Sequence, residues 1–209
     1  MVETRGVWPP DSKRLHSELA ALDAAGRVRR VVELYGDDVI LTTSFGPTAG
    51  VMLKLVTDML PQMRIVTIVH GHETQRTREL MDVYTRTLRL NIKVYAAPYL
   101  QVPTEGTPEF AHFTRVVKFE PLQAALRAEA PKAWLSGVMR EESIERRSFP
   151  FARMRGGILA VYPTLDWTRM QAIDWCLAHR LPMNEDYYDP SKGPRQDQEC
   201  GIHTHEMEG

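Results

Sequence analysis

The two cysteines are the most reactive groups of this sequence, and they lie in contrasting surroundings. Cys200 stands in the polar stretch QECGIHTHEMEG, next to Glu199 and close to His203. The thiolate is the nucleophilic form of cysteine, and a nearby positive charge such as a protonated histidine favours it. Cys176 instead falls on the apolar side of a predicted helix, where a thiol packs as an unreactive core group. We therefore predict that Cys200 is a nucleophile, against the alternative of an incidental cysteine in a polar tail.

A glycine-containing turn is the second candidate for chemistry. In TTSFGPTAG, residues 42–50, Ser44 and Thr48 supply hydroxyl groups, and Gly46 lets the backbone approach a ligand closely. A helix that begins after this turn would add the free N–H groups of its first turn, which favour phosphate. The pattern therefore predicts an anion site, although an ordinary turn between a strand and a helix has the same pattern.

A group of arginines is the third candidate. The stretch SGVMREESIERRSFPFARMR, residues 136–155, contains Arg140, Arg146, Arg147, Arg153 and Arg155. Guanidinium groups match the geometry of phosphate oxygens, so the group predicts a binding site for a polyanion. The alternative is a solvated surface on which these arginines pair with the neighbouring glutamates, and the residues alone leave both interpretations open.

A zinc site is a further interpretation of the cysteine-containing tail. Cys200, His203 and His205 could supply three ligands, and His70 and His72 could add others. This spacing matches no strong zinc motif, and the sequence has no Cys-x-x-Cys pair. An iron-sulfur cluster needs four thiolates, whereas only two cysteines are present. We therefore expect no resident metal, no iron-sulfur cluster and no tightly bound cofactor.

Charge and hydropathy restrict the partners. With 26 basic and 27 acidic side chains, the net charge of −1 provides no global attraction to nucleic acid or to a membrane surface. The opening stretch MVETRGVWPPDSKRLHSELA lacks the apolar core of a signal peptide, and no later run reaches about 18 apolar residues. We therefore expect a cytoplasmic protein that binds neither nucleic acid nor a membrane.

An alternation of strands and helices must position these candidate groups. Apolar, β-branched runs predict strands over 38–44, 64–69, 91–97, 132–137 and 158–163. Helical periodicity predicts a helix or helix pair within 1–36 and helices over 48–60, 75–88, 118–130 and 169–180. The alternation predicts an α/β fold, in which an open, mostly parallel twisted sheet has helices on both faces.

The chain has enough residues for one globular domain with a substantial core. We expect a single nucleotide-binding domain over 1–182, with 1–36 as a helical leader, and a flexible tail over 183–209 that carries Cys200. Residues 98–117 contain three prolines and predict a long excursion at the edge of the sheet. The arginine-rich stretch predicts a basic loop before the last strand.

Five stretches together resemble a known family: TTSFGPTAGVML, KFEPLQAAL, SGVMREESIERRSFP, VYPTLDW and the terminal ECGIH. The sequence is similar to the thioredoxin-dependent phosphoadenylyl-sulfate reductases, members of the adenosine-nucleotide PP-loop superfamily. The resemblance covers about residues 38–175 and 199–203. It implies that the glycine turn and the arginine loop bind an adenosine nucleotide through Ser44, Phe45, Gly46, Arg140, Ser143 and Arg146, with His203 also at the substrate.

The resemblance also implies a reaction. In that family a cysteine, here matched by Cys200, attacks the sulfur of 3'-phosphoadenylyl sulfate and becomes an S-sulfocysteine while adenosine 3',5'-bisphosphate leaves. Reduced thioredoxin or glutaredoxin then releases sulfite from the adduct. The family also implies a homodimer. Its adenylyl-sulfate branch has additional cysteines for an iron-sulfur cluster, and their absence here favours the phosphoadenylyl branch.

Two departures from the family keep other functions open. Met139 replaces one arginine of a pair, and the family's aspartate-threonine-glycine turn reads VHGHETQRT here, with Gly71 and Thr77 as the matching residues. One alternative is an ATP-using PP-loop enzyme that adenylates a substrate or transfers sulfur, although SFGPTA lacks the aspartate and second serine of that class. The other is a non-catalytic protein that binds a nucleotide or zinc.

Overall fold

The computed structural model describes residues 8–193, so Cys200, His203 and His205 lie outside the described residues. A six-stranded sheet forms the centre, with the strand order β3-β2-β1-β4-β6-β5. The strands are Val39–Thr42 (β1), Arg64–Val69 (β2), Asn91–Ala96 (β3), Ala133–Ser136 (β4), Ala152–Arg155 (β5) and Ile158–Val161 (β6). Neighbouring strands are parallel except β5, which pairs antiparallel with β6.

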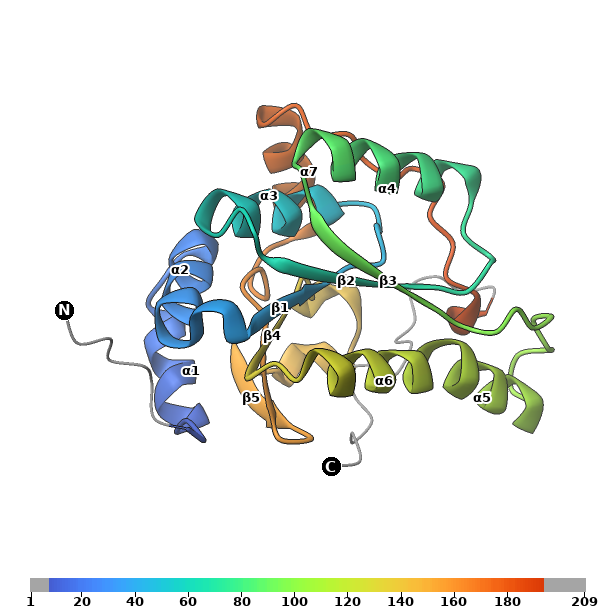
Figure 1. Ribbon diagram of the computed structural model, residues 1–209, viewed down its shortest axis with the longest axis horizontal. Helices are drawn as coiled ribbons and strands as arrows, with labels where there is room; N and C mark the ends of the chain where they lie inside the picture. Colours follow the sequence, from blue (N-terminus) through green and yellow to red (C-terminus); the bar gives the residue numbers. More distant parts are fainter. Residues whose placement is uncertain (1–7, 194–209) are drawn as a thin grey trace.

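Helices cover both faces of this sheet. They are Ser12–Ala20 (α1), Ala24–Tyr35 (α2), Ala49–Met59 (α3), Gln75–Thr87 (α4), Pro108–Thr114 (α5), Glu120–Glu129 (α6) and Arg169–Ala178 (α7). Figure 1 shows α3, α4 and α7 on one face and α6 on the opposite face. The predicted fold class is therefore confirmed. None of the helices described within 8–193 combines the length and hydropathy needed to cross a bilayer.

The central strand β1 shows why the apolar runs form this sheet. Ile40 lies between Arg64 of β2 and Trp134 of β4, and Ile40 and Leu41 are fully buried. A parallel strand covered by helices on both faces needs a continuous apolar run, and VILT supplies one. The five predicted strands and the four helices predicted after residue 36 begin and end within two residues of observed elements.

The helical leader is a pair of helices that belongs to the core. Asp11 accepts hydrogen bonds from the first N–H groups of α1, and Asp23 accepts one at the start of α2. Both acidic caps satisfy N–H groups that the helix itself leaves free. Leu19 and Val28 are fully buried, and α2 packs against α3.

Arg27 of α2 connects the helix pair to the segment that follows β6. Its guanidinium is buried and donates to the carbonyl of Leu19 at 2.9 Å and to that of Pro163 at 2.8 Å. It also forms a bidentate ion pair with Asp166 and lies 3.8 Å from the centre of the Phe151 ring. Burial would raise the pKa of Asp166, but the hydrogen bonds and charge of Arg27 lower it below its ordinary value.

The predicted excursion over 98–117 contains a helix that the sequence pattern did not indicate. Residues 108–114 form α5, and a π-helical turn over 115–119 joins it directly to α6. Glu120 donates its backbone N–H to the carbonyl of Arg115 in this wider turn. Pro121 therefore lies inside a continuous helical run and not at a free helix start. The shifted hydrogen-bonding pattern of the π-helical turn accommodates its missing N–H.

The predicted basic loop contains β5, and this expectation was wrong in part. Arg155 pairs with Ile158 across a two-residue turn made of Gly156 and Gly157, both with positive φ. Two such residues favour a tight hairpin whose twist matches that of the flanking strands. The Gly-Gly pair was the signal in the sequence that could have revealed this hairpin.

Replacement of Arg27 by methionine is predicted to lower the free energy of unfolding by about 3 kcal/mol, because two buried carbonyls and Asp166 lose their donor. The matched control is Arg30→Met on the same helix. The exposed pair of Arg30 with Glu18 should contribute less than about 1 kcal/mol. Urea unfolding followed by circular dichroism measures both, and equal losses would contradict the role assigned to Arg27.

Candidate active site

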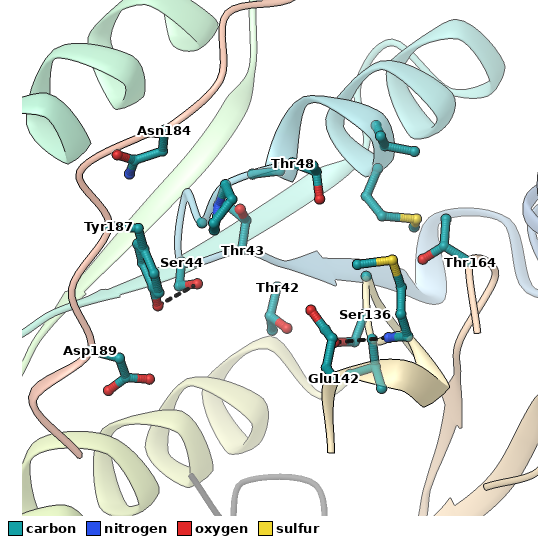
Figure 2. Close-up of a pocket in the computed structure, with 18 of the residues that line it drawn as sticks. Thr42, Thr43, Ser44, Thr48, Ser136, Glu142, Thr164, Asn184, Tyr187 and Asp189 are labelled. Atoms are coloured by element: carbon teal, nitrogen blue, oxygen red, sulfur yellow. Dashed lines mark hydrogen bonds between the residues drawn. The ribbon is translucent and has the colours of Figure 1, made fainter. Parts of the chain in front are cut away.

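A cavity of about 890 Å³ opens where the carboxyl ends of β1, β2 and β4 meet. From β1 the chain proceeds to β2 on one side, whereas β4 joins β1 on its other side later in the sequence. Ligands of open α/β sheets bind at such a switch point because the crossover connections diverge there. Figure 2 shows polar side chains around this cavity, including Thr42, Ser44, Ser136 and Asp189.

The glycine turn after β1 forms one wall. Phe45 has a φ of 51°, donates its N–H to the Thr43 hydroxyl at 3.1 Å and buries its ring. Ser44 is exposed and accepts a hydrogen bond from the Tyr187 hydroxyl at 3.0 Å (Figure 2). A Cβ atom on Gly46 would meet only ordinary contacts, the nearest at 3.7 Å. The protein itself does not require glycine there, so the space above Gly46 is available to a ligand.

The start of α3 adds positive potential to the same wall. Thr48 precedes the helix and lines the cavity, but its side chain makes no capping hydrogen bond. The first turn of α3 contains no acidic residue. The positive end of the helix dipole is therefore uncompensated by a side chain of this turn, and such an end favours an anion.

Of the arginines predicted to form a polyanion site, only Arg146 lines the cavity. It is buried and pairs with Glu142, which also accepts the backbone N–H of Met139 at 2.9 Å (Figure 2). Arg140 instead donates to the carbonyl of Phe149 at 3.0 Å, outside the cavity. Ser143 belongs to the same loop and does not line the cavity either.

The β5 hairpin separates two further arginines from the cavity. Arg153 lies over the Phe149 ring at 3.9 Å, and Arg155 lies 5.7 Å from the centre of the Trp134 ring. Because β5 turns back along β6, arginines that are close in sequence do not share one surface. Met139, which replaces an arginine of the family pattern, does line the cavity.

Lys118 is a cation of the cavity that sequence reasoning missed. It lies on the π-helical turn before α6, pairs with Asp189 and donates to the Ser191 hydroxyl at 3.0 Å. Burial would raise the pKa of Asp189, but the charge and hydrogen bond of Lys118 lower it below its ordinary value, which favours the carboxylate form of Asp189. The stretch KFEPLQAAL was the available signal, because Lys118 begins it. Arg169 and Lys192 also line the cavity.

Residues 183–193, assigned above to the flexible tail, pack along the cavity within the described structure. The Asn184 amide donates to the carbonyl of Phe45 and to the Thr77 hydroxyl, both at 2.8 Å, and its backbone N–H donates to the carbonyl of Pro47 at 3.2 Å. Thr77 therefore has a structural contact and lines a neighbouring cavity of about 90 Å³ rather than the large one. Phe45 lines that smaller cavity too.

The turn after β2 is held by its own carboxylate. The N–H groups of His70 and Gly71 donate to the two oxygens of Glu73 at 2.7 and 2.9 Å. Gly71 has a φ of 83°, and a Cβ atom there would lie 2.7 Å from the Tyr99 ring, so glycine is required by the fold. Gly71 does not line the large cavity, whereas His70 does.

The interpretation of the histidines as zinc ligands gains no support from their surroundings. His72 places its Nε2 2.8 Å from the carbonyl of Leu100 and stacks on Tyr99. Over the described range 8–193, no group of three metal-binding side chains converges. Cys176 is fully buried, which confirms it as a core residue, and burial raises the pKa of its thiol. Cys200 and His203 lie outside this range.

Comparison with known proteins shows the family of this chain. A model of the phosphoadenosine phosphosulfate reductase domain matches residues 38–189. The chain belongs to this family. It is 31% identical to the phosphoadenosine 5'-phosphosulfate reductase of Photobacterium profundum, over 80% of this chain and 70% of that protein. The reductase of Synechocystis sp. is 29% identical, over 82% and 73%. The chain is thus a member of an enzyme family, as the resemblance in sequence implied.

Solved structures show the same fold. The phosphoadenylyl-sulfate reductase of Candida auris, in a phosphate complex, has a TM-score of 0.70 at 20% identity and covers 86% of this chain and 91% of its own. The FMN adenylyltransferase of Candida glabrata has a TM-score of 0.57 at 13% identity, over 81% of this chain and 64% of its own. At these identities the two likenesses show the fold of this chain, which is PP-loop-like.

Replacement of Asn184 by alanine is predicted to destabilise the protein by about 2 kcal/mol, because a buried carbonyl and a buried hydroxyl lose their donor. Thermal unfolding measures this loss. Asn91→Ala is the matched control, because that exposed amide bonds only the carbonyl of Gln62, and its effect should stay within about 0.5 kcal/mol. A neutral Asn184→Ala substitution would show that residues 183–193 are not anchored as described.

Proposed function

We propose that this chain reduces 3'-phosphoadenylyl sulfate to sulfite and adenosine 3',5'-bisphosphate, with Cys200 as nucleophile. Membership of the reductase family supports the proposal. The observation that carries it is the cavity at the switch point, where the start of α3, Arg146 and Lys118 offer positive charge to phosphate and sulfate groups. Ser44 and Gly46 are the proposed contacts of the glycine turn with the nucleotide, whereas Arg140 acts on the loop from outside the cavity.

The proposed first step is a displacement at sulfur. The Cys200 thiolate attacks the sulfate sulfur, a bond forms between Sγ and that sulfur, and the bond from sulfur to the bridging oxygen breaks. The electron pair of that bond leaves on the 5'-phosphate of adenosine 3',5'-bisphosphate. Arg146 and Lys118 stabilise the negative charge that develops on the phosphate and sulfonyl oxygens, since their carboxylate partners hold them in place.

The proposed second step needs a dithiol protein, thioredoxin or glutaredoxin. Its first thiolate attacks Sγ of the S-sulfocysteine and expels sulfite, which leaves a mixed disulfide. The second thiolate of the partner then releases Cys200 as a thiolate and closes the disulfide of the partner. Two electrons pass from the dithiol to sulfur, so no bound metal or cofactor is needed. Because these partners are kept reduced in the cytosol, we also propose a cytoplasmic location.

The length of the chain supports delivery of Cys200 to the cavity. Residues 187 and 189 line the cavity, and Gly193 is the last described residue. Seven residues lead from Gly193 to Cys200, and an extended chain of that length spans about 25 Å. We therefore propose a nucleotide-binding domain that extends to residue 193, with residues 194–209 as the tail. A homodimer remains a proposal based on the family alone.

Incubation with 3'-phosphoadenylyl sulfate without a reductant is predicted to add one sulfite to the protein, measured as intact mass. Cys200→Ser should abolish the adduct, whereas Cys176→Ala should retain it because that thiol is buried in the core. Addition of reduced thioredoxin should release sulfite and restore the original mass. Nucleotide binding without any adduct would refute Cys200 as nucleophile, and pyrophosphate release from ATP would favour an adenylating enzyme instead.

Replacement of Arg146 by alanine is predicted to weaken binding of the nucleotide about tenfold or more, because the substitution removes a charge from the cavity wall. The loss should be larger at low salt, where charge interactions are least screened. Arg147→Ala is the matched control, because its exposed side chain does not line the cavity. Calorimetric titration measures both, and equal affinities of the two variants would contradict the role of Arg146.

A further inference from the structure

His70 is a polar group of the cavity that the reaction above leaves without a role. It follows β2, and the sheet order brings this strand end next to the glycine turn after β1. Its side chain is only 13% exposed and lines the cavity together with Ser44 and Lys118. The turn that carries it reads VHGHETQRT and departs from the aspartate-threonine-glycine turn of the family resemblance.

One nitrogen of the His70 ring is occupied. The backbone N–H of His72 donates to Nδ1 at 3.2 Å, so in the neutral ring the hydrogen belongs to Nε2. Across the described residues, Nε2 has no hydrogen-bond partner. His70 lines both the large cavity and the small neighbouring one, so a ring with one nitrogen bonded and the other without a partner can donate to a ligand bound there.

Charged groups from several elements surround His70. Glu73 from its own turn, Asp189 from the segment over the cavity, Lys118 from the π-helical turn and the His72 ring all act on it. Burial lowers the pKa of His70 below its ordinary value, and this effect exceeds the opposing influence of Glu73. When the ring gains a proton, Nδ1 can donate a hydrogen bond to the Glu73 oxygen that lies 3.1 Å away, in place of accepting one from the His72 N–H.

We propose that His70 contacts the bound sulfonucleotide, donating a hydrogen bond from Nε2 to an anionic oxygen next to Lys118, and that this contact favours the protonated ring. The inference rests on the proposed function, because it concerns the same cavity and substrate. In this proposal the turn after β2 contributes a specificity residue, His70, and the other walls contribute the cations. Binding is then linked to proton uptake, so affinity rises as the pH falls towards the range in which histidine titrates.

The test uses the full chain carrying Cys200→Ser, which prevents turnover, and calorimetric titration with 3'-phosphoadenylyl sulfate between about pH 8 and pH 5.5. His70→Asn keeps an oxygen where Nδ1 accepts from His72 but removes the donor at the Nε2 position. We expect this variant to bind about tenfold more weakly, the usual effect of losing a hydrogen bond to a charged group. His72→Asn is the matched control, because His72 does not line the cavity, and it should bind like the parent.

His70→Gln separates the hydrogen bond from the proton. Its amide can donate near the Nε2 position, so we expect affinity near that of the parent at pH 8 but a weaker gain at low pH. Protonation of the nucleotide itself is common to all variants and cancels in the comparison. Titrations in buffers of different ionisation enthalpy should show proton uptake with His70 that exceeds the uptake in both variants.

The outcomes distinguish this inference from the proposed function. If the parent binds the sulfonucleotide and both His70 variants bind equally well with the same dependence on pH, the inference is overturned and the proposed function stands. If the parent does not bind the sulfonucleotide at any pH, both are overturned. Thermal unfolding checks each variant, and His70→Gln decides the matter should the asparagine variant fail to fold.

Discussion

The parallel pairing of β1 with both β2 and β4 is the constraint on which the binding site depends. Parallel strands end at one edge of a sheet, and the connections that leave β1 and β4 lead to different parts of the molecule. The glycine turn, the loop after β4 and the turn after β2 therefore all face one cavity, although long stretches of sequence separate them.

Two cations of this cavity are held by carboxylates. Lys118 pairs with Asp189, and Arg146 pairs with Glu142. Buried ion pairs contribute little net stability because desolvation offsets their attraction, so these pairs are better explained by the positions they impose on the cations. A phosphate or sulfate group that enters the cavity meets donors whose geometry is already set, which lowers the entropy lost on binding.

The turn after β2 shows how a local departure from a family pattern changes the wall of a site. Glu73 satisfies two successive N–H groups of this turn, so the backbone here is closed to an external anion. His70 of the same turn lines the cavity, and its ring is what remains for contact with a ligand. The turn therefore presents an imidazole to the ligand instead of free backbone groups.

The sequence by itself determined the fold class, the strands and most helices, because burial on both faces of a parallel sheet leaves a local signature of continuous apolar runs. Periodicity likewise identified Cys176 as a core residue. Ser44, Gly46 and Arg146, predicted to bind the nucleotide, line one cavity, and their contact with a nucleotide stays a prediction. All of these predictions came from short motifs and from the periodicity of residues close in sequence.

Only the tertiary structure decided which of the polar groups share the cavity. Arg140 bonds the carbonyl of Phe149 outside the cavity, Arg153 and Arg155 lie on the β5 hairpin, and Lys118 reaches the cavity from the π-helical turn before α6. His70 lines the cavity from the turn after β2, and Asp189 lines it from the segment 183–193, far away in sequence. Local patterns predict elements because they depend on neighbouring residues, whereas a binding site depends on where those elements end in space.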